Sequence, residues 1–115
     1  MNSDEALDFC ANLPSAELTH PFGFETAVFK VRGKVFAIAP LDGEVAAITL
    51  KAHPDDVTEL VREHDAITRG YHMNKKHWIT VVLDGSLPEG LEEAIVTESY
   101  RLVIAGLLRA QRPVV

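Results

Sequence analysis

The sequence AVFKVRGKVFAI, residues 27–38, decides the fold, because apolar and polar side chains alternate along it on both sides of a turn signal. Phe29 and Val31 are separated by one basic residue, which is the period of two that a β-strand imposes. Gly33 then interrupts the pattern before it resumes. The stretch therefore predicts two antiparallel strands joined by the two-residue turn Arg32-Gly33.

The phenylalanines of this hairpin predict which side chains face the core. A two-residue turn places Phe29 opposite Phe36 on the same face of the sheet, and Ile38 follows on that face. Lys30 then lies on the opposite face.

A third strand is predicted over residues 45–51, after the turn signal Asp42-Gly43. Its apolar residues Ile48 and Leu50 must meet the apolar face of the preceding strand, and only a loop of odd length gives this register. We therefore expect either the three-residue turn Asp42-Gly43-Glu44 or a bulge.

The N-terminal segment predicts a helix and then a loop. Asn2 and Glu5 have the spacing of a capping box, so a helix is expected over residues 3–13, with Cys10 on its buried face. Residues 14–26 contain two prolines and a glycine. They are predicted to form a connecting loop whose aromatic side chains fold back over the core.

Two more helices are predicted by their start signals. Pro54, followed by two aspartates, predicts a helix over residues 54–64. Ser86 and Glu89 have capping-box spacing and predict the start of a long final helix. Ser99 interrupts the apolar stripe of that helix.

Two further strands are predicted on either side of a turn that carries residues 73–76. These strands cover residues 66–70 and 78–83, and the second is rich in β-branched side chains. Ile79 and Val81 form its more apolar set and are expected to face the helices, which places Trp78 on the other face.

The predicted element order is α-β-β-β-α-(β)-β-α, followed by a loose tail over residues 109–115. Strands joined by hairpins, with helices that can cover one face, predict the α+β class and a two-layer domain with a largely antiparallel sheet. The chain has 115 residues, so residues 1–115 are expected to form a single domain.

The composition predicts a cytoplasmic protein. A single cysteine excludes an internal disulfide, and no secretory signal precedes the first helix. No apolar run reaches the roughly 18 residues of a membrane span, so we expect no membrane association. We expect a monomer.

The net charge of −6 hides an uneven distribution of basic residues. Two segments contain cations and no acid, and both lie beside predicted hairpin turns, where they can meet the phosphates of double-stranded DNA. Nearby histidine and asparagine side chains can add stacking or hydrogen bonds. The residues predicted to contact nucleic acid are Lys30, Arg32, Lys34, Arg69, His72, Asn74, Lys75, Lys76 and His77.

Two alternatives account for the same residues. The lysines can instead protect sheet edges from pairing with other strands, while Tyr71 and Trp78 serve the core. The sheet face, or a groove near these two aromatic residues, can also bind a protein partner or a small ligand.

An enzyme is the third hypothesis. Cys10 lies in no nucleophile motif, the sequence holds no phosphate-binding glycine loop, and the spacing of His72 and His77 does not suit a metal site. We therefore expect no catalytic residue, no cofactor and no metal.

Five motifs occur in order along nearly the whole chain. They are Phe22-Gly23, the hairpin segment Val28–Ala37, Leu50-Lys51, the segment GYHMNKKHW (Gly70–Trp78) and the segment DGSLP (Asp84–Pro88). Together they resemble the MmcQ/YjbR family. The resemblance implies an α-β(3)-α-β(2)-α fold similar to type III secretion chaperones, described for the family as a double-wing DNA-binding domain. It implies no catalytic residues, because none is established for the family.

Overall fold

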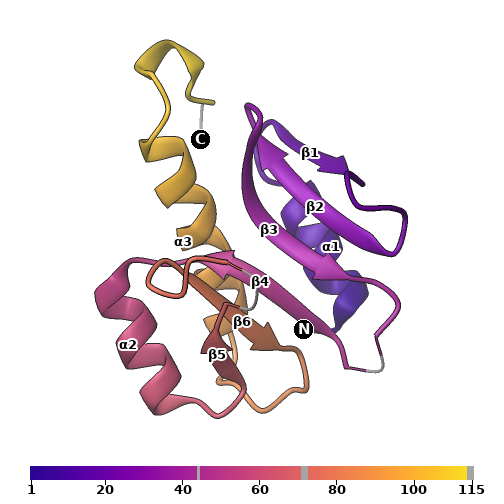
Figure 1. The fold of residues 1–115 in the computed structure, drawn as a ribbon, viewed down its shortest axis with the longest axis vertical. Helices are drawn as coiled ribbons and strands as arrows, with labels where there is room; N and C mark the ends of the chain where they lie inside the picture. Colours follow the sequence, from indigo (N-terminus) through magenta and orange to yellow (C-terminus); the bar gives the residue numbers. More distant parts are fainter. Residues whose placement is uncertain (44, 71–72, 114–115) are drawn as a thin grey trace.

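The computed structural model describes residues 1–43, 45–70 and 73–113. In this part of the chain, six strands form one antiparallel sheet of order β1-β2-β3-β4-β6-β5 (Figure 1). The helices are α1 (Ser3–Ala11), α2 (Pro54–Glu63), α3 (Leu91–Ala105) and the short 3-10 helix η1 (Arg109–Gln111); the strands are β1 (Ala16–Thr19), β2 (Thr26–Val31), β3 (Lys34–Pro40), β4 (Ala47–Lys51), β5 (Ile67–Arg69) and β6 (Trp78–Val82). The predicted α+β class with a largely antiparallel sheet is confirmed.

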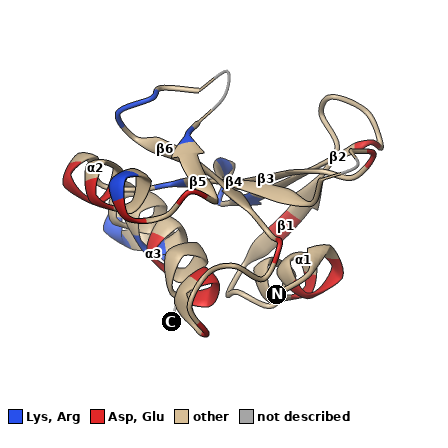
Figure 2. Ribbon diagram, turned by 90° about the horizontal axis from the view of Figure 1, so that it is seen from below, with Lys and Arg blue, Asp and Glu red and all other residues tan. Residues whose placement is uncertain are grey.

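The helices lie on one side of the sheet, as Figure 2 shows. Their buried side chains form one core with the facing strand residues, which include Ile79 and Val81 as predicted. None of the helices in the described ranges is long and apolar enough to cross a membrane.

The first two helices begin as predicted. The Asn2 side chain caps α1 and Glu5 returns the hydrogen bond, which completes the capping box. Pro54 lies in the first turn of α2, and the His53 side chain accepts a hydrogen bond from the backbone N–H of Asp55 at 3.2 Å.

The predicted start of the final helix is wrong. α3 begins at Leu91, after Gly90 in the left-handed conformation with φ of 84°. Ser86 and Glu89 do not form a capping box, because the backbone N–H of Ser86 donates to Oδ1 of Asp84 at 2.9 Å and closes a turn there. The local polar pattern is therefore used by a turn that precedes the helix.

The loop predicted over residues 14–26 contains a strand, β1, which pairs with β2 at the edge of the sheet. Its sequence AELT does alternate between apolar and polar residues, but only over four positions, and the prolines and glycine around it favoured a loop. The predicted aromatic flap over the core is also wrong: Phe22 is 74% exposed and Phe24 is 85% exposed.

The predicted two-residue turn between β2 and β3 is confirmed. Val31 pairs with Lys34, and the intervening Arg32 and Gly33 have φ of 50° and 80°. Two successive positive φ angles are the requirement of the type I′ turn, whose twist suits a hairpin.

The predicted register beyond this turn is wrong because β3 contains a bulge. Lys30 pairs with Val35 and Phe29 with Ala37, which leaves Phe36 as the extra residue. Phe29 and Phe36 still share the core, with ring centroids 6.2 Å apart. Beyond the bulge, Ile38 lies outside the core, on the face opposite to the predicted one.

The bulge also changes how β4 meets β3. Leu50 pairs with Ala37. The number of residues between these two partners is even, whereas the predicted register required an odd number. The bulge at Phe36 supplies the shift of one residue that the prediction assigned to the loop. The predicted turn includes Glu44, which lies outside the described residues.

The ladder between β3 and β4 is short, and α3 packs against both strands beside it. The two strands pair at only two positions, after which they separate toward Phe36 and Lys51. The Ser99 hydroxyl occupies this gap: it accepts from the backbone N–H of Lys51 at 2.8 Å and donates to the carbonyl of Phe36 at 2.6 Å. The residue that interrupts the apolar stripe of α3 therefore joins the helix to both halves of the sheet.

The predicted loose tail is wrong for residues 109–112. The Arg112 guanidinium donates to the carbonyls of Ala105 and Leu107 at 3.0 and 3.1 Å, and so folds the chain back on the end of α3. Nε of Arg32 donates to the carbonyl of Gln111 at 3.0 Å, which links the tail to the β2–β3 turn.

Cys10 is a core residue, as predicted. Its side chain is fully buried, and burial raises the pKa of the thiol to about 12. Because the thiolate is the reactive form, we expect Ellman's reagent to leave the native protein unmodified at about pH 8 and to titrate one thiol after denaturation. Rapid modification of the native protein would contradict the burial.

The same thiol makes stability depend on pH at the alkaline end. The unfolded chain releases the Cys10 proton near its ordinary pKa of 9.0, whereas the folded protein retains it. The unfolded state then binds fewer protons, so the contribution of this group to stability decreases as the pH rises above about 9.

Candidate nucleic-acid interface

The antiparallel topology brings both predicted basic segments to one end of the sheet. β2 ends and β3 begins there, and because neighbouring strands alternate in direction, β4 and β5 also end there and β6 begins there (Figure 1). Of the eleven Lys and Arg residues in the chain, seven lie at this end. We call it the basic end and define it by Lys30, Arg32, Lys34, Lys51, Arg69, Lys75 and Lys76.

The β2–β3 hairpin forms the first basic tip. Lys34 is exposed at its turn, Arg32 donates to the tail as described, and Lys30 is half-buried. Glu17 of β1 lies opposite Lys30 in the strand register and partly offsets its charge. Lys34 is thus the residue of this tip that is best placed to meet an external anion.

The loop between β5 and β6 forms the second basic tip. Oδ1 of Asn74 accepts from the backbone N–H of Lys76 at 2.9 Å, and the carbonyl of Asn74 accepts from the N–H of His77 at 3.0 Å. A guanidinium nitrogen of Arg69 donates to the carbonyl of Lys75 at 3.2 Å. These bonds shape the turn and leave both lysine side chains exposed.

The histidines and Asn74 were predicted to contact the ligand, and Asn74 and His77 also make hydrogen bonds within the protein. The amide oxygen of Asn74 belongs to the turn, while His77 is half-buried and its carbonyl accepts from the N–H of Ala52 at 2.8 Å. His72 and Tyr71 lie outside the described residues.

The cations of the basic end have no carboxylate partner within ion-pair distance in the described part of the chain. Acidic residues lie mostly on the helices, whereas the β5–β6 loop, on the other side of the sheet, carries lysines (Figure 2). Asp55 and Asp56 do begin α2 near this end, where the exposed amides of the helix N-terminus offset their charge. The protein therefore combines a negative net charge with one locally basic end.

A cleft separates the two basic tips. It encloses about 350 Å3 and lies beside the short β3–β4 ladder, where residues of α3 line it. Its lining contains two lysines, one aromatic residue and no carboxylate, and consists of Lys34, Val35, Lys51, Trp78, Leu102, Val103 and Gly106.

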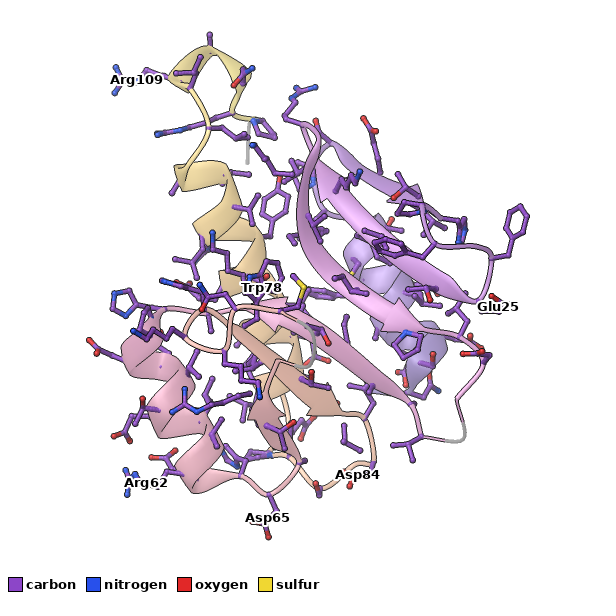
Figure 3. The ribbon with its side chains drawn as sticks, viewed as in Figure 1. Glu25, Arg62, Asp65, Trp78, Asp84 and Arg109 are labelled. Atoms are coloured by element: carbon purple, nitrogen blue, oxygen red, sulfur yellow. The ribbon has the colours of Figure 1, made fainter. Side chains whose placement is uncertain are left out.

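Trp78, the single tryptophan of the chain, is half-buried in this cleft. Figure 3 shows its position beside α3, where the two halves of the sheet meet. The backbone N–H of Gly70 donates to the carbonyl of Trp78 at 2.7 Å. A Cβ at position 70 would lie 2.7 Å from Cβ of Trp78, so glycine permits this close approach.

The sequence did not indicate the cleft as a unit, because its lining comes from β3, β4, β6 and α3. Nothing near Lys51 or Leu102 in the sequence indicates that the two residues line the same cleft, although Leu50-Lys51 is among the family motifs. Within the described ranges, no three His, Cys, Asp or Glu side chains are grouped so that they could hold a metal ion.

The fold and the basic end define a class of small α+β proteins in which one antiparallel sheet carries two basic tips at the same end. The family model described as YjbR matches residues 11–102. The chain therefore belongs to the YjbR family, as the sequence motifs predicted.

Relatives and solved structures agree with this assignment. The chain is 39% identical to the uncharacterised protein YbdF of Escherichia coli over 84% of this chain and 80% of the relative. It is 32% identical to YjbR of Escherichia coli over 90% and 88% of the two chains. The crystal structure of Deinococcus radiodurans protein DR2400 superposes with a TM-score of 0.90 and 37% identity, over 97% of this chain and 86% of the other. None of these names states a ligand or a reaction.

Proposed function

We propose that the protein binds double-stranded DNA by contacting the phosphate backbone of the DNA. The two basic tips would act as paired wings on the duplex. The observation that supports this proposal is that two acid-free segments, distant in sequence, lie at the same end of one sheet. We also propose a cytoplasmic location, where the single buried thiol stays reduced.

Local charge outweighs net charge at the distance of a phosphate contact. The Debye length at physiological ionic strength is about 8 Å, so acids on the far side of the helical layer are screened from a duplex at the basic end. The exposed cations Lys34, Lys75 and Lys76 are flexible point charges. Such contacts position a protein on DNA without reading its bases, so little sequence preference is expected.

The salt dependence of duplex binding tests this function. Three exposed lysines, or all six cations of the two acid-free segments, would release counterions with a slope of log affinity against log salt between about −3 and −5. Fluorescence anisotropy of a labelled duplex between about 50 and 200 mM salt measures this slope. No binding at about 10^-4 M protein in low salt would contradict the proposal.

Single charge reversals locate the surface. Lys75→Glu and Lys34→Glu should each weaken binding to every duplex sequence by a similar factor and reduce the steepness of the salt slope by about 1. Arg62→Glu is the matched control, since it changes the net charge equally but alters α2, where Arg62 pairs with Glu59 at 2.6 Å. Equal weakening by all three variants would show a net-charge effect and would contradict a defined interface.

A further inference from the structure

We infer that the cleft between the basic tips binds one nucleotide unit, with its base against Trp78 and its phosphate between Lys34 and Lys51. The inference rests on the proposed phosphate-binding function and extends it from the duplex to an unpaired nucleotide. The observation behind it is that two lysines and the single tryptophan line the same cleft, and that no carboxylate residue is part of its lining.

The lining matches the two halves of a nucleotide. Lys34 comes from β3 and Lys51 from β4, so each of two neighbouring strands contributes one lysine to the lining. The indole of Trp78 offers a face for stacking, and Leu102 and Val103 of α3 extend the apolar surface. Stacking on an aromatic side chain tolerates any base, because every base has a π-face.

The size of the cleft suits a single unpaired nucleotide. Its volume of about 350 Å3 lies at the small end of the range for ligand sites, roughly 300–1,000 Å3. A base pair within a duplex cannot enter, so the occupant is a base from a single strand or from a free nucleotide. Both sources offer the same chemistry, a planar base joined to a phosphate.

The C-terminal end of α3 repels a bound anion less strongly than the helix dipole alone would. The C-terminus of a helix carries partial negative charge, and Gly106, which caps α3, lines the cleft. However, the Arg112 guanidinium donates to the carbonyls of Ala105 and Leu107 at 3.0 and 3.1 Å. This cation compensates the carbonyls at the end of the helix.

The fluorescence of Trp78 gives a direct test, because the chain contains one tryptophan. The probes are an oligo-dT strand of about 12 nucleotides, an abasic phosphodiester strand of the same length and charge, and free dTMP. We expect oligo-dT to quench the emission and to bind roughly 5- to 100-fold more tightly than the abasic strand. Quenching by dTMP alone would support the nucleotide assignment and identify a free nucleotide as its source.

Variants at position 78 separate stacking from folding, with labelled strands followed by anisotropy. Trp78→Leu should lower the affinity for oligo-dT to that for the abasic strand, whereas Trp78→Phe should retain most of the difference. If wild type binds oligo-dT and the abasic strand equally, without quenching, the cleft assignment is wrong and the phosphate-binding function stands. If no strand, duplex or dTMP binds, both proposals fail.

Discussion

Ser99→Ala should lower the free energy of unfolding by about 2–4 kcal/mol, although it removes a single oxygen atom. The hydroxyl is fully buried and satisfies two backbone groups, the N–H of Lys51 and the carbonyl of Phe36, at 2.8 and 2.6 Å. Alanine would leave both groups without a partner, and each buried unsatisfied group costs about 1–3 kcal/mol. For a chain of this length, a melting temperature lower by about 10 °C is expected in a thermal scan.

Glu98→Ala is the matched control for this substitution. Glu98 is the preceding residue of α3 and is exposed, and alanine favours a helix, so its variant should lie within about 0.5 kcal/mol of wild type. If Ser99→Ala were equally mild, the hydroxyl would contribute no net stability to the junction between the strands. The cleft would then depend on packing alone.

Local signals were sufficient to predict most of the helices and strands. The capping box of α1 and the Arg32-Gly33 turn each involve residues within a few positions of one another. The local sequence therefore contains every residue that forms them. The carbonyl of the bulged residue Phe36 accepts instead from Ser99, which is 63 residues away in the chain. β1 pairs along the edge of β2, and the alternation in its sequence AELT is too short to distinguish a strand from a loop.

The candidate interface was predictable in its charges and not in its shape. The two acid-free segments are visible in the sequence, and antiparallel pairing brings them to one end of the sheet. The cleft between them is lined by residues of β3, β4, β6 and α3, which only the packed structure brings together. Asn74 was assigned to the ligand because of its chemistry, but a hydrogen bond inside the turn uses its side-chain oxygen.

Gly70→Ala should disturb Trp78 and destabilise the protein by about 1–3 kcal/mol. The added methyl group would lie 2.7 Å from Cβ of Trp78 and 3.1 Å from its backbone carbon and oxygen. Because the obstacle is largely backbone, no side-chain rotation relieves the collision. β5 must move away from β6, which also strains the hydrogen bond from the Gly70 N–H to the Trp78 carbonyl.

The shift of Trp78 should be visible in its emission spectrum, and the variant should lose much of the preference for oligo-dT over the abasic strand. Gly43→Ala is the control, since a Cβ there meets the carbonyl oxygen of Val45 at an ordinary 3.5 Å. That variant should be neutral or slightly more stable, because alanine restricts the unfolded chain. Unchanged emission and melting temperature in Gly70→Ala would show that β5 yields without cost. In that case the position of Trp78 would be set by α3 and Lys51 rather than by β5.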